Sequence, residues 1–190
     1  EARGICWGNK GLSAADLATL GLLGSVLPAL ETLRLIEYSA GPDGVLRLVE
    51  GLVAGALPAV THLYLDSMHV GDAGASALAA ALDRGALPRL EGLALMDAAI
   101  GDAALVALAP ALRRRPALQV LGLIGNPFGD EGLAALVAPP PPPAGAPPPA
   151  AGWRAGEARV QCLRFTGKVA VITTVLIKLG CGMVKLFVVW

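Results

Sequence analysis

The chain has 190 residues and a formal net charge of zero, because 15 basic residues balance 15 acidic ones. This length allows one domain with additional segments. Residues 1–152 carry nine basic and fourteen acidic residues, and this mild acidity argues against nucleic acid as a partner. The three cysteines are odd in number and widely spaced, which excludes a disulfide framework and a cysteine metal site and favours a cytoplasmic setting.

We interpret the first 26 residues as the end of a degenerate repeat unit. Residues 5–7, Ile-Cys-Trp, have the character of a strand. A helix is predicted after it from the spacing of Leu12, Leu17, Leu20 and Leu23. Because Glu1 stands inside such a unit, we interpret the chain as a fragment of a longer protein.

Residues 27–137 repeat the pattern Leu-x-x-Leu-x-Leu four times, with offsets of 30, 30 and 28 residues. The copies begin at Leu30, Val60, Leu90 and Leu118. A period in this range indicates an array of repeat units rather than one globular core. Alternate residues of a strand share a face, so the last two leucines of each copy are expected on the buried side.

Each copy continues into a turn and a helix. The turns are rich in glycine and aspartate, as in residues 71–74 and 129–132, and these residue types favour tight turns and helix caps. Leucines four apart, such as Leu78 and Leu82, then predict one buried helical face. A single unit of about 30 residues buries too little apolar surface to fold alone. We therefore predict an α/β stack in which each unit shields the next.

These residues resemble the leucine-rich repeat family, in its ribonuclease-inhibitor-like class, which also occurs in NOD-type receptors and Ran GTPase-activating proteins. The best copy runs from Leu118 to Leu136 and contains Asn126 three residues after its last strand leucine. The resemblance covers residues 3–137. It implies a horseshoe-shaped solenoid of about five repeats, the first degenerate, with parallel strands on the concave side and helices on the convex side.

The family usually places an asparagine or cysteine at the position of Asn126, where it bonds the backbone of the neighbouring turn. Asn9 is assigned to this position in the first copy, whereas Tyr38, Met68 and Ala98 occupy it in the middle copies. The resemblance therefore implies a hydrogen-bonded ladder that is broken at the centre. Tyr38 is too large for the position, so we expect a local distortion there.

Residues 138–152 consist of proline, alanine and glycine. Such a sequence cannot continue a helix and predicts an extended, semi-rigid linker between residues 1–137 and residues 153–190. An alternative is a ligand for SH3 or WW modules, because Pro-x-x-Pro is present, but no flanking arginine supports it.

Residues 153–190 differ sharply from the repeats. They carry six basic residues and one acidic residue, whereas residues 1–152 carry nine and fourteen. One interpretation is a membrane span over residues 169–190, weakened by Lys178 and Lys185. A second is a set of three strands, at residues 159–165, 168–179 and 183–190. A third is a segment that is no natural partner of the repeats.

No group of residues has the spacing of a catalytic or metal site. His62 and His69 lack further ligands at fixed spacing, and the glycines before the last turn do not form a phosphate-binding loop. We therefore expect no enzyme activity, no metal and no cofactor. Arg113 to Arg115 end a predicted helix before Pro116, where cations complement the helix dipole; an anion-binding patch is the alternative.

The residues between the strand leucines are expected to face away from the core, on the concave side. Aromatic, arginine and methionine side chains anchor protein interfaces. The candidates for partner binding are Trp7, Arg34, His62, Tyr64, Asp66 and Met96. Ordinary solvent-facing side chains are the alternative, and Gly92, Ala94 and Gly122 are expected to make the far rows flat. Five strands span about 20 Å, which suits a small protein epitope better than a deep small-molecule pocket.

These expectations favour a non-catalytic, cytoplasmic protein–protein interaction module that presents a concave repeat surface to a protein partner. The sequence does not identify this partner, and a membrane contact would need residues 169–190. The alternatives are a GTPase-activating repeat protein of the Ran type, the sensor repeats of a NOD-type receptor, and a membrane-tethered repeat protein.

Overall fold

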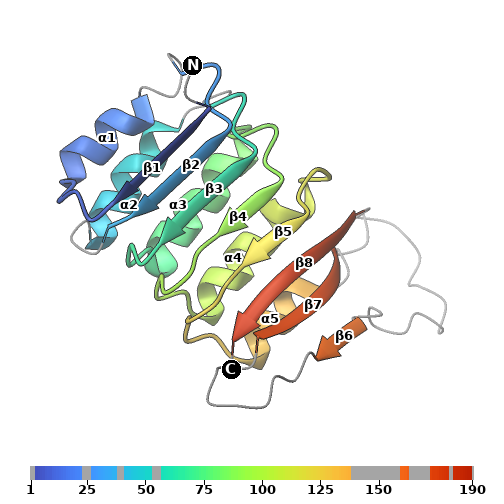
Figure 1. Cartoon of the computed structure of the whole chain (residues 1–190). Coiled ribbons are helices and arrows are strands. Elements are labelled where there is room, and N and C mark those ends of the chain that lie inside the picture. Colours follow the sequence, from blue (N-terminus) through green and yellow to red (C-terminus); the bar gives the residue numbers. More distant parts are fainter. Residues whose placement is uncertain are drawn as a thin grey trace, which may run out of the picture.

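The computed structural model describes residues 3–22, 27–37, 41–52 and 57–137, and the backbone of residues 159–162, 172–179 and 182–189. Strands and helices alternate as far as residue 137 (Figure 1). In chain order they are β1 Gly4–Gly8, α1 Ala14–Leu22, β2 Thr32–Ile36, α2 Gly41–Gly51, β3 His62–Asp66, α3 Gly71–Asp83, β4 Gly92–Ala94, α4 Asp102–Arg113, β5 Val120–Gly122 and α5 Asp130–Val137. This part of the chain is therefore α/β, built from five strand–helix units.

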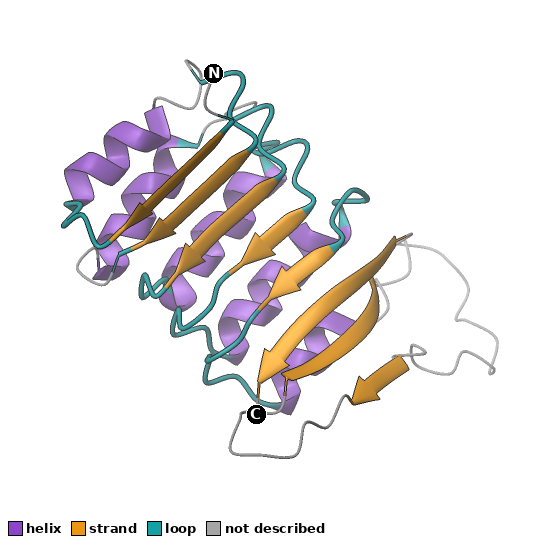
Figure 2. Ribbon diagram, viewed as in Figure 1, coloured by secondary structure: helices purple, strands orange, loops and turns teal. Residues whose placement is uncertain are grey.

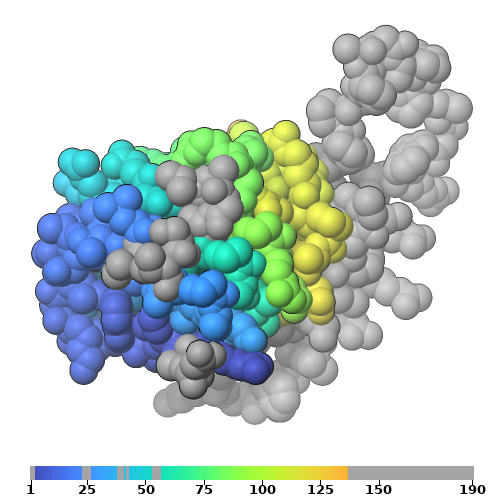
Figure 3. Space-filling model, turned by 90° about the horizontal axis from the view of Figure 1, so that it is seen from above, coloured from blue at the N-terminus to red at the C-terminus, as the bar shows by residue number. Residues whose placement is uncertain are grey.

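The first five strands form one parallel sheet in chain order. One row across it consists of Ile5, Leu33, Leu63, Leu93 and Leu121. The helices α1 to α5 lie on the same face of this sheet (Figure 2). Seen from above, the units follow one another in chain order, from blue to yellow (Figure 3). The spacing of the sequence copies is thus the spacing between neighbouring strands.

One continuous core lies between the sheet and the helices. Its strand leucines are at most 1% exposed, and the buried leucines of the helices are at most 3% exposed. The members on the strands include Leu33, Leu35, Leu63, Leu65, Leu93 and Leu121, and those on the helices include Leu48, Leu78 and Leu108. Leu95 and Leu123, which directly follow β4 and β5, belong to the same core. The expected buried face of each copy is confirmed, because period-two alternation and helical spacing both point the leucines inward.

Glycine allows the first two helices to approach each other closely. A Cβ atom on Gly21 in α1 would lie 2.5 Å from the carbonyl oxygen of Leu48 in α2. A Cβ atom on Gly51 in α2 would lie 2.9 Å from the backbone of Gly21. The two backbones therefore meet at a place where no larger side chain fits without a shift.

The register of β1 differs from the expected one. Trp7 pairs with Leu35, which points toward the helices. A register shifted by one residue would pair Trp7 with Arg34 and put it on the helix-free face. Because neighbouring strand residues point to opposite faces, this difference moves Ile5 and Trp7 to the helix side of the sheet. Ile5 packs against the core there. The predicted position of Trp7 is therefore wrong, and Cys6, which pairs with Arg34, takes the helix-free face instead.

Asn126 bonds the neighbouring turn, as expected. Its Oδ1 accepts hydrogen bonds from the backbone N–H groups of Ala98 and Ile100, both at 3.0 Å. Its Nδ2 donates to the carbonyl oxygen of Leu95 at 2.6 Å and to that of Leu123, in its own unit, at 3.0 Å. The amide therefore satisfies backbone groups of two successive units at once.

The equivalent positions of the other units hold no such amide. Asn9 is exposed, and its side chain makes no hydrogen bond among the described residues. Because of the register of β1, the residue equivalent to Asn126 in this unit is the one after Asn9. The assignment of Asn9 is wrong. Met68 and Ala98 are fully buried and fill the position with apolar atoms. Tyr38, where a distortion was expected, lies outside the described residues.

Two aspartates connect the middle units instead. The Oδ1 atom of Asp72 in α3 accepts hydrogen bonds from the N–H groups of Gly101 and Ala104, at the start of α4, at 3.1 and 3.2 Å. Asp102 in α4 does the same for two N–H groups at the start of α5, at 2.7 and 2.9 Å. Each carboxylate thus caps the following helix rather than its own. The ladder itself is interrupted at Met68 and Ala98, as expected, and these aspartates supply a separate connection between the units.

The last part of the chain adds three strands, β6 Arg159–Cys162, β7 Ile172–Leu179 and β8 Gly182–Val189. β8 pairs in parallel with β5, and β7 and β6 follow as antiparallel neighbours. These strands agree with the strand interpretation of the tail. Within the described ranges, no helix is long and apolar enough to cross a membrane. The predicted linker, residues 138–152, lies outside them.

Candidate functional site

The candidate site lies on the face of the sheet that points away from the helices, here called the open face (Figure 2). Its side chains alternate with the buried leucines along β2, β3 and the chain through β4 and β5. Five of the six predicted residues gather here: Arg34, His62, Tyr64, Asp66 and Met96. Trp7 does not join them, because it lies on the helix side of β1, where it is 36% exposed.

A ridge formed by Arg34, Tyr64 and His62 crosses the middle of the open face. Arg34 and Tyr64 are register partners on neighbouring strands. The Arg34 guanidinium lies 5.4 Å from the centre of the Tyr64 ring, within the range of a cation–π contact. The ring of His62, two residues earlier on the same strand, stacks on the Tyr64 ring. The two ring centres are 6.2 Å apart, and the ring planes are 11° from parallel. The three side chains therefore support one another while all remain partly exposed.

Asp66 forms an ion pair with Arg34. Its Oδ2 atom lies 3.2 Å from Nη2 of Arg34, and the residue is only 4% exposed. Burial raises the pKa of Asp66 above its usual value, although Arg34 and the backbone N–H of Met96 oppose that shift. Sequence reasoning placed Asp66 among the partner contacts. The structure gives it another place, as a buried support for the exposed guanidinium.

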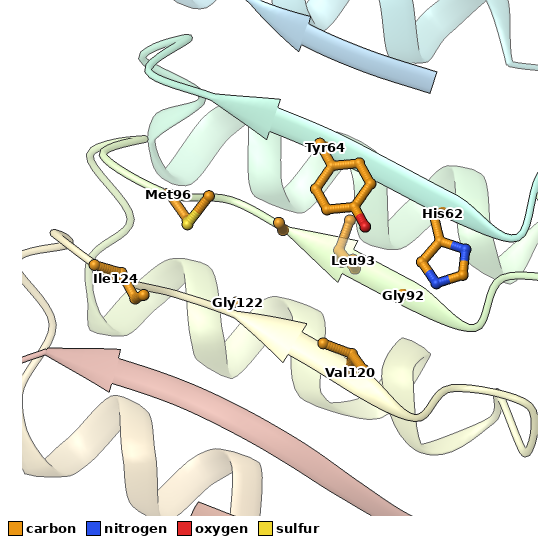
Figure 4. Close-up of a pocket in the computed structure, with 9 residues that line it drawn as sticks. His62, Tyr64, Gly92, Leu93, Met96, Val120, Gly122 and Ile124 are labelled. Atoms are coloured by element: carbon orange, nitrogen blue, oxygen red, sulfur yellow. The ribbon is translucent and has the colours of Figure 1, made fainter. Parts of the chain in front are cut away.

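A hollow of about 200 Å³, here called the trough, lies beside the ridge. Its lining consists of His62, Tyr64, Gly92, Leu93, Ala94, Met96, Val120, Gly122 and Ile124. The rings of β3 stand on one side, and Met96, Val120 and Ile124 surround a floor of small residues (Figure 4). A Cβ atom on Gly92 would lie 2.6 Å from Cδ2 of His62, so glycine is what lets this ring settle over β4.

The surface around Gly92, Ala94 and Gly122, which was expected to be flat, is therefore hollow. Gly92, Ala94 and Gly122 have small side chains or none, so the larger side chains beside them leave a depression. Sequence reasoning did not select Val120 and Ile124 as site residues. Val120 and Ile124 are branched apolar residues two positions before and two positions after Gly122, so all three share the open face. This alternation could have indicated them from the sequence.

The three consecutive arginines at the end of α4 serve the helices. Arg113 donates to carbonyl oxygens near the end of α5, and Arg115 donates to the Ala86 carbonyl oxygen at 2.9 Å, just after α3. Arg114 forms an ion pair with Asp83 at 3.0 Å. These contacts support the helix-end interpretation over an anion-binding patch. In the part of the chain that the structure describes, no group of His, Cys, Asp or Glu side chains is arranged to hold a metal ion.

Comparison with known proteins adds no further candidate. No family model matches the chain, and no curated protein matches it. The repeat pattern, the ridge and the trough are therefore the features of this chain that indicate a function.

Proposed function

We propose that the chain is part of a leucine-rich-repeat solenoid of the ribonuclease-inhibitor-like class, and that its open face is the concave side of a horseshoe arc. The spacing of the copies near 30 residues, the in-register leucines and the hydrogen bonds of Asn126 support this proposal. In such an array every unit is a supersecondary element that needs its neighbours for burial.

We further propose that the module is non-catalytic and binds a protein partner through the open face. The observation that carries this proposal is the ridge of Arg34, Tyr64 and His62 beside an apolar trough. Tyrosine and arginine are enriched among the residues that dominate interface energetics. Because Asp66 and Tyr64 already hold Arg34, its side chain loses little conformational freedom when a partner binds.

The test begins with a photo-reactive residue at Thr32, on the open face, to cross-link and identify the partner from cells. Calorimetry then compares the purified partner's affinity for the full chain and for two variants. Tyr64→Ala is expected to weaken binding by about 2 kcal/mol or more, as for an interface anchor. Val106→Ala is the control, because Val106 is 48% exposed on α4, on the helix side. Equal affinities for both variants would remove the open face as the binding surface.

A further inference from the structure

We infer that the trough receives an apolar side chain of the partner that is flanked by a cationic residue. This inference rests on the proposed function, because it specifies what the open face binds. The occupant is a protein segment in which leucine, methionine or phenylalanine neighbours lysine or arginine.

The apolar part of this inference comes from the lining of the trough. Met96, Val120 and Ile124 present hydrocarbon or thioether groups, and Leu93 and Ala94 lie beneath. The ring of Tyr64 closes one side (Figure 4). A space of about 200 Å³ with this lining favours an apolar side chain, which leaves water on entering it.

The cationic part comes from unequal charge at the Met96 end of the trough. Asp66 precedes Ser67, whose N–H donates to the Met96 carbonyl oxygen at 2.7 Å, and Asp97 directly follows Met96. Arg34 pairs with Asp66. Asp97 is exposed and has no ion pair among the described residues. Arg34 is therefore already paired with Asp66, and a partner cation would pair with the exposed Asp97 carboxylate.

The exposed carboxylate of Asp97 gives the Met96 end of the trough a negative charge. A cation of the partner therefore meets complementary charge beside Asp97, where an anion would be repelled.

The experiment uses the full chain and two fluorescein-labelled peptides that share the core Leu-Phe-Leu. In one peptide lysines flank the core, and in the other glutamates do. Fluorescence anisotropy is expected to show that the lysine-flanked peptide binds at least about tenfold more tightly at low salt, and that this preference shrinks at high salt.

Three variants locate the peptide. Ala94→Leu fills the trough and should abolish binding of both peptides, and Met96→Ala, which only removes atoms, should weaken both. Asp97→Asn should reduce the preference for lysine by about fivefold. Asp43→Asn is the matched control, because Asp43 is an exposed carboxylate on α2. Thermal melting checks that each variant is folded.

The inference is overturned if neither peptide binds, if both bind equally, or if binding survives in folded Ala94→Leu. The proposed function fails separately, when the cross-linked partner binds Tyr64→Ala and Val106→Ala equally well. A partner that depends on Tyr64 but whose bound segment lacks an apolar–cationic pair overturns the inference alone.

Discussion

Single side chains connect the units of this protein across a distance of about one repeat in the sequence. Asn126 satisfies backbone groups of its own unit and of the preceding one, and Asp72 and Asp102 cap the helices that follow them. Glu37 joins the first two units in a related way, because its Oε2 atom accepts a hydrogen bond from the Gly11 N–H at 2.9 Å. Different residue types thus perform the same physical task, which is to satisfy backbone N–H groups at turns and helix ends.

Replacing Asn126 by alanine should destabilise the protein. The change leaves the N–H groups of Ala98 and Ile100 without their partner, and each unsatisfied buried group costs about 1–3 kcal/mol. Urea denaturation should therefore show a loss of about 2–4 kcal/mol in the free energy of unfolding. Asn9→Ala is the matched control, because the Asn9 side chain is exposed, and its loss should be smaller, limited to the strain of alanine at the positive φ of this position. Similar losses for both variants would contradict the assigned hydrogen bonds.

Asp66 predicts a particular dependence of stability on pH. Because burial raises its pKa in the folded state above the usual 3.8, the folded protein holds the proton more tightly than the unfolded chain does. The contribution of Asp66 to stability therefore falls as pH rises from about 4 through the raised pKa. The stability of Asp66→Asn relative to the wild type, measured by urea denaturation between pH 4 and 7, should increase with pH. A constant or decreasing difference would contradict the prediction.

At the level of elements, close helix packing depends on which residues have no side chain. Gly21 and Gly51 bring the backbones of α1 and α2 together, and the alanines of α3 and α4 fill their buried faces. On the opposite side of the sheet, Gly92 gives the His62 ring its place. Small residues therefore determine the spacing of the helices and the shape of the trough.

Gly21→Ala separates two opposing effects. Helix propensity alone predicts a gain of up to about 1 kcal/mol. The added Cβ atom would lie 2.5 Å from the Leu48 carbonyl oxygen, and relieving such overpacking costs typically about 1–3 kcal/mol, so we expect a net loss. Gly8→Ala in β1 is the control, because a Cβ atom there meets nothing within 4 Å. Thermal and urea unfolding measure both variants, and a stabilised Gly21→Ala would show that α1 and α2 are less tightly packed.

At the scale of the whole molecule, the tail strands cover the edge of β5. The strand order is β1-β2-β3-β4-β5-β8-β7-β6, so β8 covers the edge of β5 that a further repeat would otherwise occupy. Edge strands with free N–H and carbonyl groups pair readily with other chains. The tail is therefore a structural end to the parallel sheet, although its composition differs from that of the repeats.

A chain that ends at residue 137 should associate with itself. Removing β8 exposes the backbone of β5, so sedimentation is expected to show concentration-dependent association that the full chain lacks. Adding Val120→Lys to the shortened chain should restore the monomer, because a charge on an edge strand opposes pairing. A shortened chain that stays monomeric would show that β8 is not needed to protect this edge.

The repeat spacing alone was sufficient to predict alternating strands and helices, the inward leucines and the grouping of Arg34, His62 and Tyr64 on one face. These features follow from local periodicity, which is the same in every copy. The one-residue change in the register of β1, the burial of Asp66, the capping by Asp72 of a helix about 30 residues away and the pairing of β8 with β5 emerged from the folded arrangement. Each depends on how two separate segments align in space, and where the pattern is degenerate or changes composition, local periodicity carries no information about that alignment.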